Sequence, residues 1–218
     1  MKLIVGITGG IACGKSNVCQ NIRDLGYTVL DCDKISYELS LKGNIVYKEI
    51  IKAFGSDYLL SDGQIDRRKL GKLIFSNEES RILLNSISHP HIKNELLRQI
   101  NSLSDKLVFI EVPLLFESGF NELCNCVICI YLERELQIKR LMERDLIDRE
   151  YAITKISSQM DLERKKLLAD YIIDTKGSFD DTKKQVEKII KEIKRSVDYG
   201  CNWNRWKPNK ISFTNTLL

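Results

Sequence analysis

The segment 9–16, with the sequence GGIACGKS, constrains this chain more than any other because it fits the phosphate-binding pattern G-x-x-x-x-G-K-[ST]. An apolar run at residues 3–7 precedes it, which predicts a strand. Apolar residues at helical spacing follow it, namely Val18, Ile22 and Leu25. The motif is meaningful only between a strand and a helix, and the sequence supplies both. We therefore predict that this segment is a loop that binds a nucleoside triphosphate.

The chemistry of this loop follows from its glycines and from the helix after it. Glycines let the backbone wrap closely around a polyphosphate, and the helix adds its free N–H groups and the positive end of its dipole. Lys15 is expected to reach the β- and γ-phosphates of ATP, and Ser16 to hold Mg²⁺. The predicted nucleotide-binding residues are consecutive: Gly9, Gly10, Ile11, Ala12, Cys13, Gly14, Lys15, Ser16 and Asn17. The alternative is a glycine-rich turn with an unrelated lysine, which the flanking strand and helix disfavour.

Length and composition describe a globular chain of modest charge. Its 218 residues suffice for one α/β core with an inserted subdomain, and 43% hydrophobic and 29% charged residues are ordinary values. The net charge of +4 does not by itself favour nucleic-acid binding. No apolar stretch approaches the ~20 residues of a membrane span, and no secretory signal precedes the first predicted strand. We expect a cytoplasmic monomer or weak homo-oligomer with no nucleic-acid and no membrane partner.

Seven cysteines are scattered along the chain, and two of them, Cys126 and Cys129, form a C-x-x-C pair. Such a pair can bind zinc or carry redox chemistry. Here it lies in the apolar run 126–132, which predicts a buried strand, and strand residues three apart face opposite ways. No second cysteine pair or nearby histidine completes a tetrahedral site. We interpret these cysteines as small buried side chains in a reducing compartment.

Strand-like apolar runs alternate with helical patterns, which predicts an α/β fold with a parallel sheet covered by helices. Five strands are expected, at 3–7, 27–30, 107–112, 126–132 and 171–174. About 70 residues separate the second from the third, far more than the roughly dozen residues that a simple crossover needs. Their helical periodicity predicts a helical insertion over the strand ends, where such folds bind ligands.

These elements define the expected organisation of a single domain. The core comprises 1–33, 107–133 and 168–198, the helical insertion is 34–106, and a stretch dense in Arg and Lys occupies 134–167. The last helix carries one apolar face, made of Val186, Ile189, Ile190, Ile193 and Val197. The tail, 199–218, is interpreted as a loose terminus, with a docking segment for a partner as the alternative.

Asp31 and Asp33 form a second informative pair, at the carboxyl end of the second predicted strand. If the two-residue alternation of the strand runs through them, both side chains point to the same side. Phosphoryl transfer to a hydroxyl needs a carboxylate that orients and deprotonates the nucleophile, and this pair is a candidate for that role. The alternative is that the two aspartates cap a helix that begins near Lys34 or Ile35.

Further segments stand in order along the chain: GITGGIACGKS at 6–16, DCD at 31–33, IDR at 65–67, SHP at 88–90, EVPLLFE at 111–117, RLMERD at 140–145 and ADYIID at 169–174. Together they resemble dephospho-coenzyme A kinases, which are P-loop kinases with a nucleoside monophosphate kinase-like fold. The resemblance runs from about residue 2 to 190, and the combination is far more specific than a P-loop alone. It implies a three-layer P-loop kinase fold with a five-stranded parallel sheet, a helical acceptor-binding insertion and a lid at 134–167. It also implies transfer of the γ-phosphate of ATP, with Mg²⁺, to the 3′-hydroxyl of dephospho-CoA.

The resemblance implies catalytic roles for Asp33 as the base, for Lys15, and for two lid arginines, Arg140 and Arg144. The arginines are four residues apart on a predicted helix and therefore share a face, which suits a lid that closes over the transferring phosphoryl group. The alternative is an exposed helix with ion pairs such as the one between Glu143 and Arg144.

The resemblance also assigns the acceptor to a set of residues spread along the chain: Asp33, Arg67, His89, Pro90, Glu111, Leu114, Leu115 and Phe116. Each has a structural alternative. The His-Pro element could be a short, sharply turned helix junction, and Arg67 could form an ion pair with Asp66 or Asp62. The apolar residues at 114–116 could be simple core.

Five positions depart from the usual pattern of the family, and one of them is Cys32, which replaces the usual Ala between the two aspartates. Ala12 replaces a usual Gly, and Cys13 a small polar residue, both at variable positions of the general motif. Glu111 stands where Asp is more common, and its longer carboxylate should still reach the Mg²⁺ hydration shell or the acceptor. Thr175 replaces a usual Asn, which leaves a contact on the adenine side open.

Three rival functions remain for comparison. A kinase of the same fold with another small acceptor is the nearest, and the segments at 88–90 and 111–117 argue against it. A regulatory GTPase needs an N-K-x-D element, but Asn209-Lys210 continues with Ile211 and Ser212. A nucleotide-binding protein without catalysis is disfavoured because the lysine, serine, aspartate and arginines of a transferase are all present.

Overall fold

The computed structural model describes residues 2–198, apart from the side chains of 196–198. The predicted tail therefore lies outside the described residues. The chain divides into two compact units, one made of Met1–Val29 and Asp105–Leu218 and the other of Leu30–Ser104. We call them the phosphate-loop unit and the helical unit. The division falls inside the strand β2, Thr28–Asp31.

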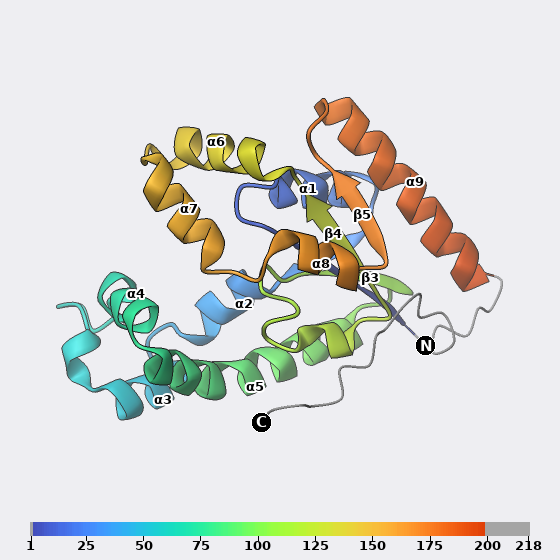
Figure 1. The fold of residues 1–218 in the computed structure, drawn as a ribbon. Coiled ribbons are helices and arrows are strands. Elements are labelled where there is room, and N and C mark those ends of the chain that lie inside the picture. The colour runs from blue at the N-terminus through green and yellow to red at the C-terminus, as the bar shows by residue number, and fades with distance from the viewer. Residues whose placement is uncertain (1, 199–218) are drawn as a thin grey trace, which may run out of the picture. The chain divides into compact units, whose positions relative to one another are not determined.

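A five-stranded sheet organises the phosphate-loop unit, in the order β2-β3-β1-β4-β5 (Figure 1). Its other strands are β1 (Leu3–Gly9), β3 (Leu107–Glu111), β4 (Cys126–Tyr131) and β5 (Tyr171–Asp174). The central strand β1 runs parallel to both neighbours, with Val5 opposite Phe109 of β3 and Cys126 of β4. The strands β1, β3 and β4 are almost continuously buried, as expected for a parallel sheet covered on both faces. The α/β fold with five parallel strands is confirmed.

Helices α1 (Lys15–Asp24) and α9 (Phe179–Asp198) pack on each other beside this sheet (Figure 1). The predicted apolar face of α9 is buried at Val186, Ile189, Ile190 and Ile193. In α1 the prediction holds for Val18 and Ile22, but Leu25 follows the helix as its C-cap and is 38% exposed. Helix α8 (Leu162–Leu168) contacts β4 and β1.

The C-x-x-C pair lies inside β4, as the sequence predicts. Cys126 belongs to the buried cluster that α1 and α9 cover, together with Ile128 and Ile130, whereas Cys129 is buried outside that cluster. The two thiols therefore face opposite sides of the sheet. None of the six cysteines that the structure describes forms a disulfide.

Helices α6 (Arg134–Asp145) and α7 (Arg149–Ser157) form a smaller apolar cluster of their own. Its buried members are Ile138, Leu141, Ala152 and Ile156. Both helices begin at acidic N-caps, since Glu133 accepts a bond from the N–H of Glu135 and Asp148 from that of Tyr151. We call this pair the α6–α7 hairpin, and it makes up most of the predicted lid region.

The helical unit contains α2 (Cys32–Leu39), α3 (Ile45–Phe54), a short 3₁₀ turn (Ser56–Tyr58), α4 (Arg67–Ser76) and α5 (Glu78–Ser102). Helix α5 contacts each of the other α-helices in this unit. The unit has its own core, built on Val46, Ile50, Ile65 and Leu70. The helical insertion that the sequence predicts is therefore present.

The interpretation of the His-Pro element as a helix junction is wrong, because Pro90 lies inside the continuous 25-residue helix α5. Proline removes one helical hydrogen bond, which leaves the carbonyl of Ser86 without its usual donor. Ser86 and Pro90 are both exposed, so water can reach that carbonyl. Packing of α5 against α2, α3 and α4 holds the helix together on either side.

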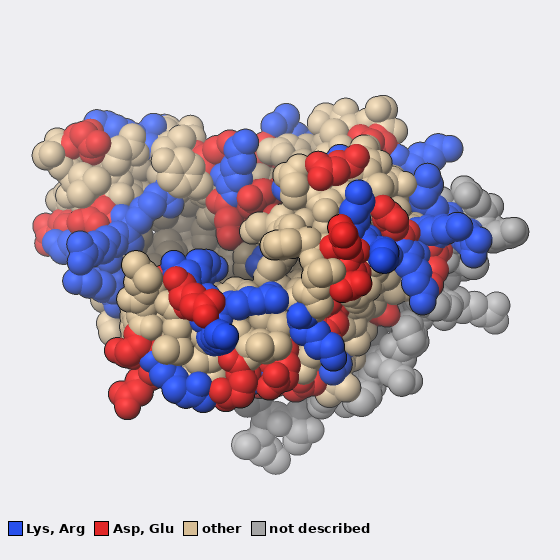
Figure 2. All heavy atoms as spheres, turned by 90° about the horizontal axis from the view of Figure 1, so that it is seen from above, with Lys and Arg blue, Asp and Glu red and all other residues tan. Residues whose placement is uncertain are grey.

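Charged side chains of both signs are mixed over the face that Figure 2 draws, with no area of one sign alone. This is in keeping with the net charge of +4. Among the described residues, no helix combines the length and the apolar composition needed to cross a membrane.

Candidate active site

The phosphate-binding loop lies between β1 and α1, as predicted. Strand β1 ends at Gly9, where an added Cβ would lie 2.6 Å from the carbonyl oxygen of Ile130, so only glycine permits this approach to β4. Gly14 caps α1 with a left-handed φ of 82°, a conformation that glycine adopts at little cost. Helix α1 begins at Lys15, which directs the first N–H groups of the helix toward the loop.

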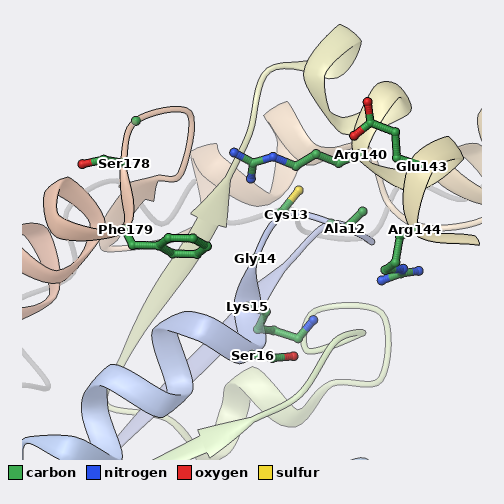
Figure 3. A pocket seen from close by; sticks show the side chains of 12 residues that line it. Ala12, Cys13, Gly14, Lys15, Ser16, Arg140, Glu143, Arg144, Ser178 and Phe179 are labelled. Atoms are coloured by element: carbon green, nitrogen blue, oxygen red, sulfur yellow. The ribbon is translucent and has the colours of Figure 1, made fainter.

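A cavity of about 700 Å³ opens over this loop (Figure 3). It is lined by Gly10, Ala12, Cys13, Gly14, Lys15, Ser16, Arg140, Glu143, Arg144, Gly177, Ser178 and Phe179. The structure thus brings together Lys15, Ser16 and both predicted lid arginines. Three of the predicted nucleotide-binding residues, Gly9, Ile11 and Asn17, are not part of this lining.

Arg140, Glu143 and Arg144 come from α6 and line the cavity (Figure 3). Arg140 donates to the carbonyl oxygen of Thr175 at 2.7 Å and to its hydroxyl at 3.3 Å. Arg144 pairs with the neighbouring Asp145 at 2.8 Å rather than with Glu143, the partner named in the alternative. Asp145 is half-buried and also pairs with Lys155 at 2.8 Å.

Thr175 ties this arginine to the phosphate loop. It is buried, and its hydroxyl donates to the carbonyl oxygen of Cys13 at 2.9 Å. The Thr175 side chain therefore bonds to the loop and to Arg140. Sequence reasoning missed the next cavity residues, Gly177, Ser178 and Phe179. Their position directly after β5, at the carboxyl end of a parallel strand, is the signal that could have found them.

Cys13 carries the one thiol in the cavity wall among the described residues. Burial disfavours the thiolate and raises the pKa of Cys13 to about 11, although Lys15 and Arg140 act in the opposite direction. The thiol is therefore neutral at physiological pH and has no role as a nucleophile.

The segment after β3 is held by a buried ammonium group. Lys165 of α8 is 0% exposed, and its Nζ lies 2.8 Å from Glu117 and 3.0 Å from the carbonyl oxygen of Pro113. Thr8 donates to the same carbonyl oxygen at 3.0 Å, one residue before the phosphate loop begins.

The predicted acceptor residues of the phosphate-loop unit follow this segment. Glu111 ends β3 and lies 3.9 Å from Arg23 of α1. Leu115 is fully buried and belongs to the core, whereas Leu114 is 43% exposed. Phe116 is half-buried. The reading of this apolar run as core is therefore correct for Leu115 alone.

In the helical unit the two aspartates are not equivalent. The strand ends at Asp31, so the expected alternation through Asp33 is wrong. Asp31 is the N-cap of α2, and its Oδ1 accepts from the N–H groups of Asp33 at 2.9 Å and Lys34 at 3.1 Å. The capping interpretation holds for Asp31, with the helix starting at Cys32. Asp33 lies in the first helical turn and is exposed.

Arg67 also has a different partner from the one expected. It donates to the hydroxyl of Ser40 at 2.7 Å and to the carbonyl of Tyr37 at 3.3 Å, and it stacks on the Tyr37 ring. Asp66 instead caps α4, so the described residues give Arg67 no carboxylate partner. Arg67 lines a small cavity of about 170 Å³ within the helical unit. Burial lowers the pKa of His89, which favours the neutral ring.

Comparison with known proteins decides the family. The dephospho-CoA kinase family matches residues 3–181. The chain is 40% identical to a dephospho-CoA kinase of Bacillus licheniformis over 193 residues, which covers 87% of this chain and 96% of that protein. This chain belongs to the dephospho-CoA kinase family.

Solved structures place this dephospho-CoA kinase family member among the P-loop kinases. A dephospho-CoA kinase from Campylobacter jejuni matches with a TM-score of 0.67 and 34% identity, covering 90% of this chain and all of the other. A shikimate kinase from Acinetobacter baumannii, solved in complex with shikimate, shares only the fold, with a TM-score of 0.53 and 18% identity over 95% of this chain and 97% of that one. The family match ends inside α9, so the remainder of that helix lies outside it.

Proposed function

We propose that this chain transfers the γ-phosphate of ATP to the 3′-hydroxyl of dephospho-CoA, giving CoA and ADP in the last step of CoA biosynthesis. The observation that carries the proposal is the cavity in which Lys15, Ser16, Arg140 and Arg144 meet. Those side chains supply what phosphoryl transfer requires of a protein, namely positioning and stabilisation of charge. Membership of the dephospho-CoA kinase family supports the choice of acceptor.

The nucleotide lies with its triphosphate on the loop. The N–H groups at the start of α1 and the Lys15 ammonium bind the β- and γ-phosphates. The adenine ring extends toward the end of the cavity formed by Gly177, Ser178 and Phe179. The ring of Phe179 is 77% exposed and points into the cavity (Figure 3), so an aromatic base can stack on it.

Mg²⁺ enters with the nucleotide. The Ser16 hydroxyl is exposed at the cavity wall, and hydroxyl, phosphate and water oxygens are the ligands that this ion prefers. When bound, the ion neutralises charge on the phosphate oxygens. The carboxylate of Glu111 is proposed to act on its hydration shell or on the acceptor.

The two arginines serve as the lid. Arg140 exchanges its bonds to Thr175, and Arg144 its pair with Asp145, for the equatorial oxygens of the transferring phosphoryl group. Closing the lid excludes water, which would otherwise hydrolyse ATP.

Asp33 is proposed as the base that orients and deprotonates the 3′-hydroxyl. Its first-turn position leaves the carboxylate exposed, because Asp31 already supplies the cap. Arg67, His89 and Pro90 are proposed to bind the acceptor. Because burial lowers the pKa of His89 and makes its ring a weaker base, we propose that His89 positions the acceptor.

In the phosphate-loop unit, Leu114 and Phe116 are proposed as an apolar wall for the acceptor, with Leu115 anchoring them in the core. We also propose a cytoplasmic monomer or weak homo-oligomer with no nucleic-acid partner. Thiols outside disulfides, as in the described residues, are typical of that reducing compartment.

An assay of ATP consumption with a panel of acceptors tests the function. Dephospho-CoA, AMP, UMP, shikimate and pantothenate are each supplied with ATP and Mg²⁺, and dephospho-CoA should be phosphorylated far faster than the others. Equal or faster turnover of a nucleoside monophosphate would overturn the proposal in favour of another kinase of this fold.

A further inference from the structure

The backbone of a single residue, Ile11, links the phosphate loop to the α6–α7 hairpin and to Gln159 just after it. The Nε2 atom of Gln137 donates to the carbonyl oxygen of Ile11 at 2.8 Å. The N–H of Ile11 donates to Oε1 of Gln159 at 3.2 Å. Both backbone groups of Ile11 are therefore taken by side chains more than 100 residues away in the sequence. A carbonyl can only accept and an N–H can only donate, so the two amides have fixed and opposite orientations.

Packing around this peptide reinforces the contact. Ile11 and Ala12 pack against the buried cluster of the α6–α7 hairpin. Ala12 has a left-handed φ of 59°, which costs a residue with a Cβ roughly 1 kcal/mol. At Gly10, an added Cβ would lie 2.5 Å from Nε2 of Gln137, so the loop and the amide are in close contact. The contact of the Ala12 methyl with the cluster offsets part of the backbone strain.

The position of Gln137 connects this contact to the catalytic arginines. Gln137 is 2% exposed and lies three and seven residues before Arg140 and Arg144, on the same face of α6. A helix is rigid over two turns, so the bond from Gln137 to Ile11 sets how far α6 stands from the phosphate loop. Gln159, which follows α7, accepts a hydrogen bond from the N–H of the same residue, Ile11.

We propose that Gln137 and Gln159 are positioning residues that fix the phosphate loop to the α6–α7 hairpin and thereby place both lid arginines relative to the phosphates of ATP. The inference rests on the proposed function, in that the loop binds ATP. It predicts that the affinity for ATP depends on two side chains that do not line the ATP cavity.

Two identical substitutions test the proposal, because the two amides have opposite roles. Gln137→Glu replaces a donor with a carboxylate that cannot donate to the Ile11 carbonyl when ionised. Gln159→Glu keeps an acceptor for the Ile11 N–H and adds the same negative charge beside the same residue. We expect Gln137→Glu to weaken binding of a non-hydrolysable ATP analogue and to lower kcat, each by about tenfold or more, and Gln159→Glu to stay within about threefold of the wild type.

The pH dependence of ATP-analogue binding by Gln137→Glu is a second measurement, and a purely structural role of Gln137 would not change it. Protonation gives the introduced carboxyl at position 137 an O–H donor, and burial raises the pKa of such a group. The ATP-analogue defect of Gln137→Glu, relative to the wild type at each pH, should therefore grow between about pH 6 and about pH 9. Calorimetry with the analogue measures this without the acceptor, so the result stands even if dephospho-CoA proves not to be the acceptor.

Further variants keep the proposal falsifiable if Gln137→Glu fails to fold. Gln159→Leu removes the acceptor at a half-buried position and should weaken ATP-analogue binding by about tenfold. Asn125→Leu is the matched control, since Asn125 accepts from the N–H of Ile4 at 2.8 Å near the other end of β1. It should lower Tm and leave ATP affinity unchanged. Normal ATP affinity in Gln159→Leu, or equal defects in the two glutamate variants, would overturn the proposal.

Discussion

The two units of this chain hold their predicted site residues in different ways. In the phosphate-loop unit, Lys15, Ser16 and the lid arginines line one cavity of about 700 Å³. In the helical unit, polar side chains are engaged locally: Asp31 caps α2, and the predicted acceptor residue Arg67 is bound to Ser40 and Tyr37. A site that is formed mainly by backbone N–H groups and a helix end is set by the fold itself. In a site formed by long polar side chains, the position of each side chain depends on the residues to which it bonds.

The largest effects are expected for side chains proposed to act on the reacting atoms, and smaller effects for side chains proposed to bind or position the substrates.

The first test separates Asp33 from Asp31. Asp33→Asn should lower kcat by ~10²–10⁴-fold, because an amide cannot accept the proton of the 3′-hydroxyl at neutral pH. ATP affinity and Tm should barely change, since the Asp33 side chain does not cap the helix. Asp31→Asn is the control, because asparagine also caps helices well, and it should be nearly neutral in both activity and Tm.

The opposite pattern would reverse the assignment. If Asp33→Asn keeps normal turnover and Asp31→Asn loses it, then Asp31, the N-cap of α2, is the base. Steady-state kinetics and thermal denaturation of both variants decide between these outcomes.

The second test concerns Lys15. Lys15→Ala removes a point charge from the transferring phosphoryl group and should lower kcat by at least ~10²-fold, on the scale of losing one preorganised stabilising group. Single-turnover kinetics with saturating dephospho-CoA measure the chemical step directly. A variant with normal turnover would show that this loop is not where the chemistry takes place.

The third test compares the two arginines, which differ in their partners. Arg140→Ala and Arg144→Ala should each lower kcat by about 10–10²-fold. Arg140 also bonds to Thr175, so its loss should cost about 1–2 kcal/mol of unfolding free energy. Arg144 pairs with Asp145 at the surface, where ion pairs contribute little, so its loss should leave stability nearly unchanged. Chemical denaturation beside kinetics separates the two, and equal stability losses would contradict this division.

The smallest effect is expected at Pro90. Pro90→Ala restores the missing donor for the Ser86 carbonyl within α5 and should raise the unfolding free energy by about 1 kcal/mol. If Pro90 also positions the acceptor, KM for dephospho-CoA rises a few-fold while KM for ATP does not change. A stabilised variant with an unchanged acceptor KM would remove Pro90 from the acceptor site.

The sequence predicted the fold and the phosphate loop well because both depend on short-range patterns. Apolar runs predict buried parallel strands, and the glycines of the loop are required by a close approach at Gly9 and a left-handed φ at Gly14. The predicted strand at 171–174 coincides with β5. The strand predicted at 27–30 is shifted by one residue at each end, because Tyr27 precedes β2 and Asp31 ends it.

The errors had two sources, namely long-range packing that overrides a local preference and a helix cap that ends a strand early. Pro90 disfavours a helix locally, yet contacts of α5 with three other helices keep it continuous. The alternation of a strand was extended through Asp33, but the carboxylate of Asp31 begins a helix after the strand. The role of Gln137 had no signal in the sequence, because its partner, Ile11, precedes it by more than 100 residues.

The position of β1 at the centre of the sheet also determines the order in which the molecule can form. Val5 pairs with Phe109 and Cys126, which both follow it by more than 100 residues. Strand β1 therefore cannot pair during synthesis until β3 and β4 have been made. The helical unit is one continuous segment with its own core, and it can fold meanwhile. The phosphate loop at the end of β1 can therefore take its final place only after β3 and β4 have been made.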